Sequence, residues 1–258
     1  MPVPFFLNTK SEFLKLRRTS AIWLTLFAAA FIPTIDCIIC VERAHDMIPK
    51  FKTDSWLVFF HFTWKNTAAV ILPFYAILLI NQILQIEYRN YTWKQVYTTP
   101  RKYADIFFSK IIVIHTLIIC FLLLFNFFTF ISACTANLIR PGYNFFATRV
   151  PWDKIIPLTL RVYIGILGVT AIQYWLSARF RNFIIALGFG FGLWATGLAL
   201  FDWDKIIYYP YMYATLLFFN DSNQNPGEFV KLIVCSIISF PVALLLGFWN
   251  IYRLKEKG

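Results

Sequence analysis

The sequence predicts an all-α membrane protein that crosses the bilayer several times as a single domain over residues 1–258. Hydrophobic residues make up 59% of the chain and charged residues only 14%, whereas soluble domains carry about 45–50% apolar and about 25% charged residues. The apolar residues also fall in long runs, and about 20 helical residues suffice to cross the hydrocarbon core. A soluble protein could not bury this much apolar surface, so we expect a polytopic membrane protein.

Within residues 20–251, six apolar segments have the length of a membrane span. They are Ser20–Cys40, Asn66–Ile86, Ile106–Ser132, Pro157–Ser177, Phe183–Phe201 and Phe229–Ile251. Two further apolar patches, Trp56–Phe62 and Ile206–Phe219, are too short to cross alone, which indicates interfacial or re-entrant helices. The second patch lies in a predicted outer loop, residues 202–227. If it did cross, the C-terminus would change sides.

Before the first predicted span, a short stretch mixes apolar and charged residues. Phe13, Leu14 and Leu16 lie among the charged residues of Asn8–Arg18. This pattern predicts an amphipathic interfacial helix, within residues 1–19, at the inner membrane surface. A basic anchor that flanks the first span is the alternative. The charged residues concerned are Glu12, Lys15, Arg17 and Arg18.

The distribution of lysine and arginine predicts the orientation of these spans. If both termini are cytoplasmic, roughly twice as many basic residues lie inside as outside, as the positive-inside rule requires. Acidic residues show the opposite bias. Topology therefore explains the net charge of +11 without a nucleic-acid partner. We expect six transmembrane helices with both termini in the cytoplasm.

Motifs that would support chemistry on this chain are missing from the sequence. It contains no G-x-x-x-x-G-K-[ST] phosphate loop, no H-E-x-x-H zinc motif and no G-x-S-x-G nucleophile motif. The three histidines are scattered, so we expect no metal site and no cofactor on this chain. An intramembrane enzyme is poorly supported for the same reason, and any ATP-driven process needs a separate ATPase chain.

Charged groups within the predicted spans are few. Asp36 lies near the outer end of the first span and Lys65 near the outer start of the second, so their depths should match. Ionisable groups in a membrane are costly and usually have a paired or functional role. An ion pair between them is one interpretation. The other is that Lys65 reaches the interface while Asp36 faces water.

Small residues raise two further alternatives. Gly188 and Gly192 have the spacing that lets helices approach closely, either within the chain or between two copies of it. Cys37, Cys40 and Cys134 are expected to be small buried apolar residues. A disulfide from Cys134 to Cys37 or Cys40 is the alternative if that side of the membrane is oxidising.

The largest basic segment between two predicted spans, residues 87–110, offers the main clue to function. A chain with so little soluble mass must meet water-soluble partners through short loops. Aromatic residues here can anchor an interface, and the basic residues suit an acidic partner. They are Tyr91, Trp93, Tyr97, Arg101 and Lys102. A helix lying on anionic lipid, with its aromatic residues at headgroup level, is the alternative.

The order of residues in this segment resembles the first cytoplasmic loop of ABC transporter type-2 permeases, in particular the lantibiotic or bacteriocin self-immunity branch. The matching residues are Glu87, Thr92, Trp93, Lys94, Pro100, Ser109 and Lys110, with Glu12, Lys15, Arg17 and Arg18 before the first span. The six-span layout and the chain length also fit. Tyr91 departs from the pattern, because many relatives carry glycine before the threonine.

The resemblance implies that residues 87–105 form a coupling helix in a groove of a cytoplasmic ABC ATPase dimer, which would bind ATP and Mg. The residues implied in ATPase coupling are Glu87, Tyr91, Trp93, Lys94, Tyr97, Pro100 and Arg101. The resemblance also implies a second permease protomer, identical or paralogous, and a location in the bacterial cytoplasmic (inner) membrane.

An apolar, aromatic-rich pathway without a buried row of charges favours an amphipathic or hydrophobic cargo over ions or sugars. A peptide, a lipid or an antibiotic has this character, and membrane lipid surrounds the chain. In the self-immunity branch the task would be to expel a membrane-active peptide. The alternative function is a non-transporting membrane anchor or assembly subunit of a secretion or motility complex.

Overall fold

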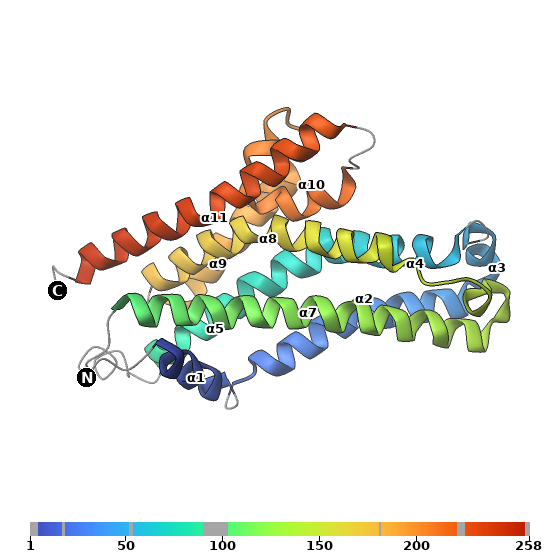
Figure 1. Ribbon diagram of the computed structural model, residues 1–258, viewed down its shortest axis with the longest axis horizontal. Coiled ribbons are helices and arrows are strands. Elements are labelled where there is room, and N and C mark those ends of the chain that lie inside the picture. The colour runs from blue at the N-terminus through green and yellow to red at the C-terminus, as the bar shows by residue number, and fades with distance from the viewer. Residues whose placement is uncertain are drawn as a thin grey trace.

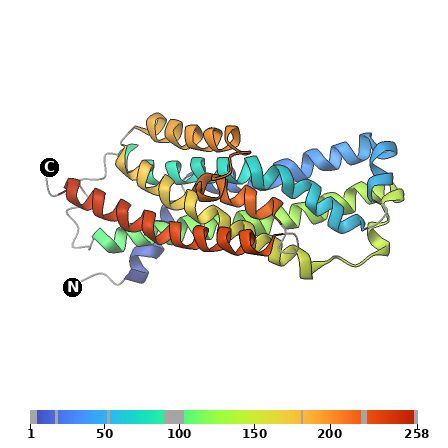
Figure 2. The same cartoon turned by 90° about the horizontal axis from the view of Figure 1, so that it is seen from above.

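The computed structural model describes residues 5–16, 19–51, 54–89, 103–180, 182–220 and 225–255. Throughout these ranges the chain forms helices joined by short connections, with no strand. The long helices lie side by side in an elongated bundle, as Figures 1 and 2 show from two directions. The predicted all-α class is therefore confirmed.

The first part of the bundle consists of α1 (Phe5–Leu16), α2 (Ala21–Glu42), α3 (Ala44–Met47), η1 (Ile48–Phe51), α4 (Ser55–Asn66), the π-helix η2 (Thr67–Ile71), α5 (Leu72–Arg89) and α7 (Tyr103–Ile139). The second part consists of η3 (Pro141–Tyr143), η4 (Phe145–Ala147), α8 (Trp152–Arg179), α9 (Phe183–Ala199), η5 (Ile206–Tyr208), η6 (Pro210–Met212), α10 (Tyr213–Phe219) and α11 (Pro226–Lys255).

Among the described residues, five helical segments are long and apolar enough to cross a membrane. They are Ala21–Glu42, Ser55–Gln85, Ala104–Ile139, Trp152–Arg179 and Pro226–Arg253. The patch Trp56–Phe62, expected to form an interfacial or re-entrant helix, instead belongs to one continuous helical segment, Ser55–Gln85, with the second predicted span. The predicted fifth span corresponds to α9, which has only 17 residues. The count of six spans is thus not confirmed by length and composition.

Helix α1 and the C-terminal end of α11 lie at the same end of the bundle (Figure 1). We call this the terminal end and the opposite one the far end. Helix α7 has 37 residues, about 55 Å at the usual rise per residue, whereas the hydrocarbon core is about 30 Å thick. Helices α2, α4 and α7 continue to the far end, where short connections join them (Figure 1).

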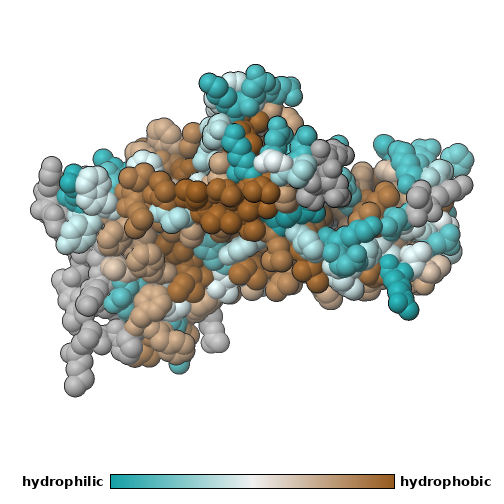
Figure 3. All heavy atoms as spheres, turned by 45° about the horizontal axis from the view of Figure 1, so that its top comes forward, coloured by the Kyte–Doolittle hydropathy of each residue, from teal (hydrophilic) through white to brown (hydrophobic). Residues whose placement is uncertain are grey.

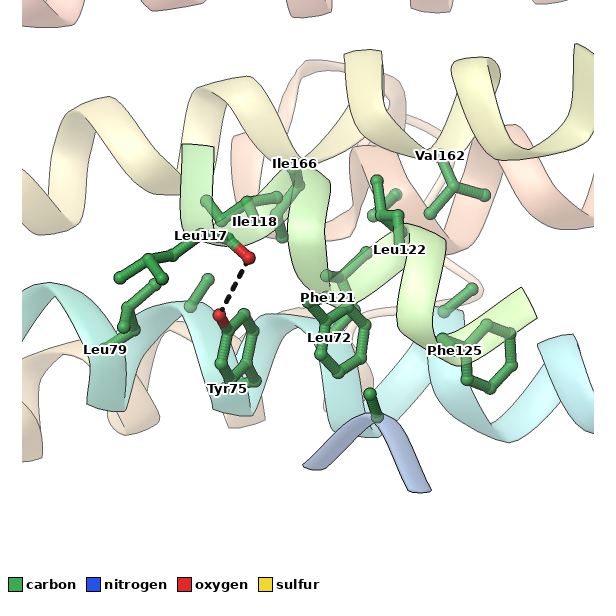
Figure 4. Close-up of a cluster of buried hydrophobic side chains, with 14 of the residues drawn as sticks. Leu72, Tyr75, Leu79, Leu117, Ile118, Phe121, Leu122, Phe125, Val162 and Ile166 are labelled. Carbon is green, nitrogen blue, oxygen red and sulfur yellow. Dashed lines mark hydrogen bonds between the residues drawn. The ribbon is translucent and has the colours of Figure 1, made fainter. Parts of the chain in front are cut away.

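Apolar side chains between α5, α7 and α8 form the centre of the bundle (Figure 4). Tyr75 is buried there, and its hydroxyl donates to the Leu117 carbonyl at 3.2 Å and lies 2.8 Å from the Thr25 hydroxyl. On the outside, apolar residues form a broad band, while hydrophilic ones gather at the right-hand end and at the top (Figure 3). Such a band suits contact with lipid.

The π-helix η2 has a local cause in the sequence. Pro73 follows it and has no backbone N–H, so carbonyls in the preceding turn lose their intrahelical donor. Side chains from other helices donate to them instead. The Trp194 indole reaches the Ala69 carbonyl at 3.1 Å, and the Thr215 hydroxyl reaches the Ala68 carbonyl at 3.4 Å. Helices α9 and α10 thereby satisfy the irregular backbone inside the bundle.

Candidate functional site

Helix α1 packs against the beginning of α7 through an unexpected face. Asn8, Glu12 and Leu16 recur one turn apart and are buried, because residues four apart share a helix face. Phe6 and Leu14 lie on the outside, with exposed fractions of 75% and 53%. A short helix forms here, but its predicted amphipathic, interfacial character is not confirmed, because Glu12 is buried while Phe6 and Leu14 are exposed.

Glu12 points into the protein because it forms a buried ion pair with Lys110 of α7. The Lys110 ammonium lies 2.8 Å from Glu12 Oε2, and both side chains are almost fully buried, with exposed fractions of 2% and 7%. Lys15, one turn along α1, pairs with the other oxygen of the same carboxylate. Removing one partner from a buried pair strongly destabilises a protein, because the other charge stays buried. The pair therefore fastens α1 to the beginning of α7.

A weaker contact extends this junction. The Thr9 hydroxyl donates to Ser109 Oγ at 3.3 Å, next to the ion pair in both helices. We call Thr9, Glu12, Lys15, Ser109 and Lys110 the α1–α7 cluster. Sequence spacing predicts the charges of α1 and a lysine at the beginning of the third span, but not their pairing, because about a hundred residues separate them.

The predicted coupling residues fall beside this cluster along the chain. Helix α5 ends at Arg89 and α7 begins at Tyr103, both at the terminal end (Figure 1). Glu87 lies within α5, where the structure describes its backbone but not its side chain. The residues outside the described ranges are Tyr91, Trp93, Lys94, Tyr97, Pro100 and Arg101 of the coupling segment, and Arg17 and Arg18.

The other predicted site residues lie elsewhere in the bundle. Asp36 is buried in α2, with an exposed fraction of 2%, while Lys65 in α4 is exposed. In the part of the chain that the structure describes, no ion pair joins them. The cysteines, including Cys37, Cys40 and Cys134, are free thiols in the structure.

The glycines of α9 divide into two groups. A side chain on Gly190 would contact Ile77 of α5 at 2.8 Å, so this glycine allows close packing within the chain. Gly188 and Gly192 face open space instead, with nothing within 4 Å of where a side chain would begin. Packing within the chain therefore does not account for the predicted Gly188–Gly192 pair.

A comparison with known protein families shows which family the chain belongs to. A family model described as "ABC-2 family transporter protein" matches residues 9–196, well over half of the chain. The chain belongs to the ABC-2 transporter family. The match includes the α1–α7 cluster and the segment between α5 and α7 that suggested this family. No curated protein and no solved structure matches the chain. As an ABC-2 family member with several apolar helices, it is a multi-pass membrane protein.

Proposed function

We propose that this ABC-2 family member is the membrane permease subunit of an ATP-driven exporter in the bacterial cytoplasmic membrane. ATP and Mg bind to a separate ABC ATPase, a dimer that docks on residues 87–105. The terminal end of the bundle faces the cytoplasm, in agreement with the basic residues near it. The lantibiotic self-immunity branch is the nearest functional type, and the cargo is an amphipathic or hydrophobic peptide, lipid or antibiotic.

The α1–α7 cluster is the observation that carries this proposal. Residues 87–105 lead directly into α7, and Lys110 lies about two turns after the start of that helix. Because Lys110 pairs with Glu12, a force applied to the coupling segment reaches α1 and α7 together. A junction that joins two helices at one buried pair suits a subunit that is moved by a partner and whose sequence has no phosphate-binding loop.

The path of the chain supports a sixth crossing. Helix α8 ends near the terminal end, and α11 begins well away from it and returns there (Figures 1 and 2). The chain must therefore travel away from the terminal end between these helices, and α9 makes most of that passage. At 17 residues, α9 is about 25 Å long. Buried α10 then packs inside the bundle as a re-entrant segment.

A second permease protomer completes the transporter. The exposed face of α9 carries Gly188, Gly192 and Thr196 one turn apart, which is the small-residue spacing of closely packed membrane helices. Two copies meeting at this face would place their α9 helices in contact. Lipid covers the rest of the apolar band.

Charge reversal in the coupling segment tests the docking of the ATPase. We expect Trp93→Ala with Lys94→Glu to abolish co-purification of the ATPase that accompanies the wild-type chain, because an aromatic anchor and a basic contact are both lost. The matched control is Trp203→Ala with Lys205→Glu, which changes an exposed Trp and a Lys with the same chemistry away from the terminal end. Co-purification that survives the first double variant would contradict the proposed docking.

A further inference from the structure

Asp36 is a buried acid without a partner cation. It lies in the far half of α2 with an exposed fraction of 2%, and its Oδ2 atom is buried and accepts no hydrogen bond. Among the described lysines, arginines and histidines, none forms an ion pair with it. An isolated carboxylate is very costly to bury, whereas a neutral carboxyl group costs far less. The site therefore requires a proton or another positive charge that the described residues do not supply.

The nearest hydroxyl cannot supply a hydrogen bond to the carboxylate without giving one up. Thr63 of α4 is a hydrogen-bonding neighbour of Asp36. Its hydroxyl has one hydrogen, and this donates to the Phe59 carbonyl at 3.0 Å. On α7, the Ser132 hydroxyl hydrogen is likewise used, on the Pro33 carbonyl at 2.6 Å. The Thr63 hydroxyl can therefore donate to the carboxylate only if it releases the Phe59 carbonyl, whereas a hydrogen on the carboxyl group would keep both bonds.

The other titratable groups near Asp36 do not supply the positive charge that its carboxylate would need. On α2, Cys37 and Cys40 are free thiols, which carry no positive charge. From η3, the Tyr143 hydroxyl donates to the Cys40 carbonyl at 2.7 Å, and burial raises the pKa of that hydroxyl, so it stays neutral. On α4, Lys65 is exposed, and α7 contributes the thiol of Cys134. Just beyond α7, the exposed Arg140 donates to the Val41 carbonyl of α2 at 3.4 Å and forms no ion pair with Asp36. No group among these compensates a negative charge on Asp36.

We propose that Asp36 is a proton-binding site whose neutral carboxyl group donates a hydrogen bond to Thr63 Oγ1 and so joins α2 to α4. Thr63 then accepts from Asp36 while it still donates to Phe59, and every hydrogen in the group has an acceptor. The proton fits because it needs no cavity and no further ligands. Loss of the proton would leave an uncompensated charge between α2 and α4 and weaken their contact in the far half of the bundle.

The pH dependence of stability tests this site. The folded protein would hold the Asp36 proton more tightly than the unfolded chain, where aspartate releases its proton near pH ~3.9. Stability relative to Asp36→Asn, a neutral mimic of the acid, should therefore fall as pH rises above this value and level off once the folded protein releases the proton. The measurement is thermal unfolding of the full chain in detergent, from about pH 4.5 to about pH 9.

Asp153→Asn is the matched control, since Asp153 is an exposed acid that forms no ion pair among the described residues. Its difference from wild type should show no such fall. A pH-independent difference for Asp36→Asn, or one that grows with pH, would overturn the proposal. Infrared spectroscopy of the wild type gives an independent test. A protonated carboxyl band that is missing from Asp36→Asn should persist above pH ~3.9 and disappear as pH rises further, and its absence throughout the range would also overturn the proposal.

Discussion

The two ends of the bundle are held together by different chemistry. At the far end, aromatic rings pack around a buried tryptophan and form an aromatic cluster. Its members are Phe51, Trp56, Phe59, Phe130, Tyr143 and Phe145. At the terminal end, the α1–α7 cluster joins two helices mainly through charge and hydroxyl contacts. Aromatic packing is spread over many contacts, whereas an ion pair concentrates the interaction in a few atoms.

This difference suits opposite requirements at the two ends. Many dispersed contacts resist movement because no single change releases them. A junction with few contacts still transmits force through its helix, yet it can shift when those contacts change. We therefore expect the far end to act as the rigid part of the bundle and the terminal end as the part that responds to a partner.

The largest loss of stability should follow from changing the aromatic cluster. Trp56 is 2% exposed, stacks on Phe130 at 5.3 Å and donates to the Phe145 carbonyl at 2.9 Å. Trp56→Ala should lower the free energy of unfolding by about 4 kcal/mol, because it leaves a cavity and an unsatisfied carbonyl. Trp56→Phe keeps a ring and should lose only about 1 kcal/mol. Equal losses in denaturant unfolding would show that ring packing does not dominate.

A smaller but still large effect is expected at the terminal end. Glu12→Gln should lower the free energy of unfolding by about 3 kcal/mol, because the buried Lys110 ammonium loses a carboxylate. Replacing both residues, as Glu12→Leu with Lys110→Met, should restore most of this loss, since no buried charge remains. The exposed Glu228 provides the control Glu228→Gln. If the double variant were less stable than the single one, a buried-charge origin of the effect would be excluded.

The smallest effect on the fold is expected at the exposed face of α9, which belongs to neither cluster. Gly188→Leu with Gly192→Leu should not lower the free energy of unfolding, because both positions face open space and leucine favours the helix more than glycine does. The mass of the detergent-solubilised particle should instead fall from two protomers to one. Gly190→Leu should instead lower the free energy of unfolding, because a side chain at this position would collide with Ile77. A dimer that survives the double leucine variant would exclude this face as the interface.

Hydropathy predicts much of this fold because the position of each span depends on the local composition of the chain. Three predicted spans lie within α7, α8 and α11, and the first predicted span begins one residue before α2. The second predicted span begins too late, because Lys65 and Asn66 interrupt the apolar pattern although the helix continues through them. Such interruptions are tolerated when the polar residues have an exposed face, and Lys65 has one.

The contacts of the site are harder to predict than its location. The sequence predicts that residues near Glu12 and Lys110 matter, but their pairing depends on how α1 crosses α7 and not on any spacing along the chain. Asp36 was predicted as one member of a pair with Lys65 or as facing water. In the structure it is buried and forms no ion pair with any described residue, because α2 turns this side chain into the bundle.

The π-helix η2 has a consequence for which mutations the gene can tolerate. A π-turn contains one residue more than an α-turn, so deleting a single codon within Thr67–Ile71 could restore regular α-helix. Each residue turns a helix by about 100°. Everything before the deletion would then rotate relative to α5, and the buried face of Trp56 and Phe59 would turn away from its partners. A substitution at these positions changes one contact, whereas a one-codon deletion would misalign the whole far half of this span.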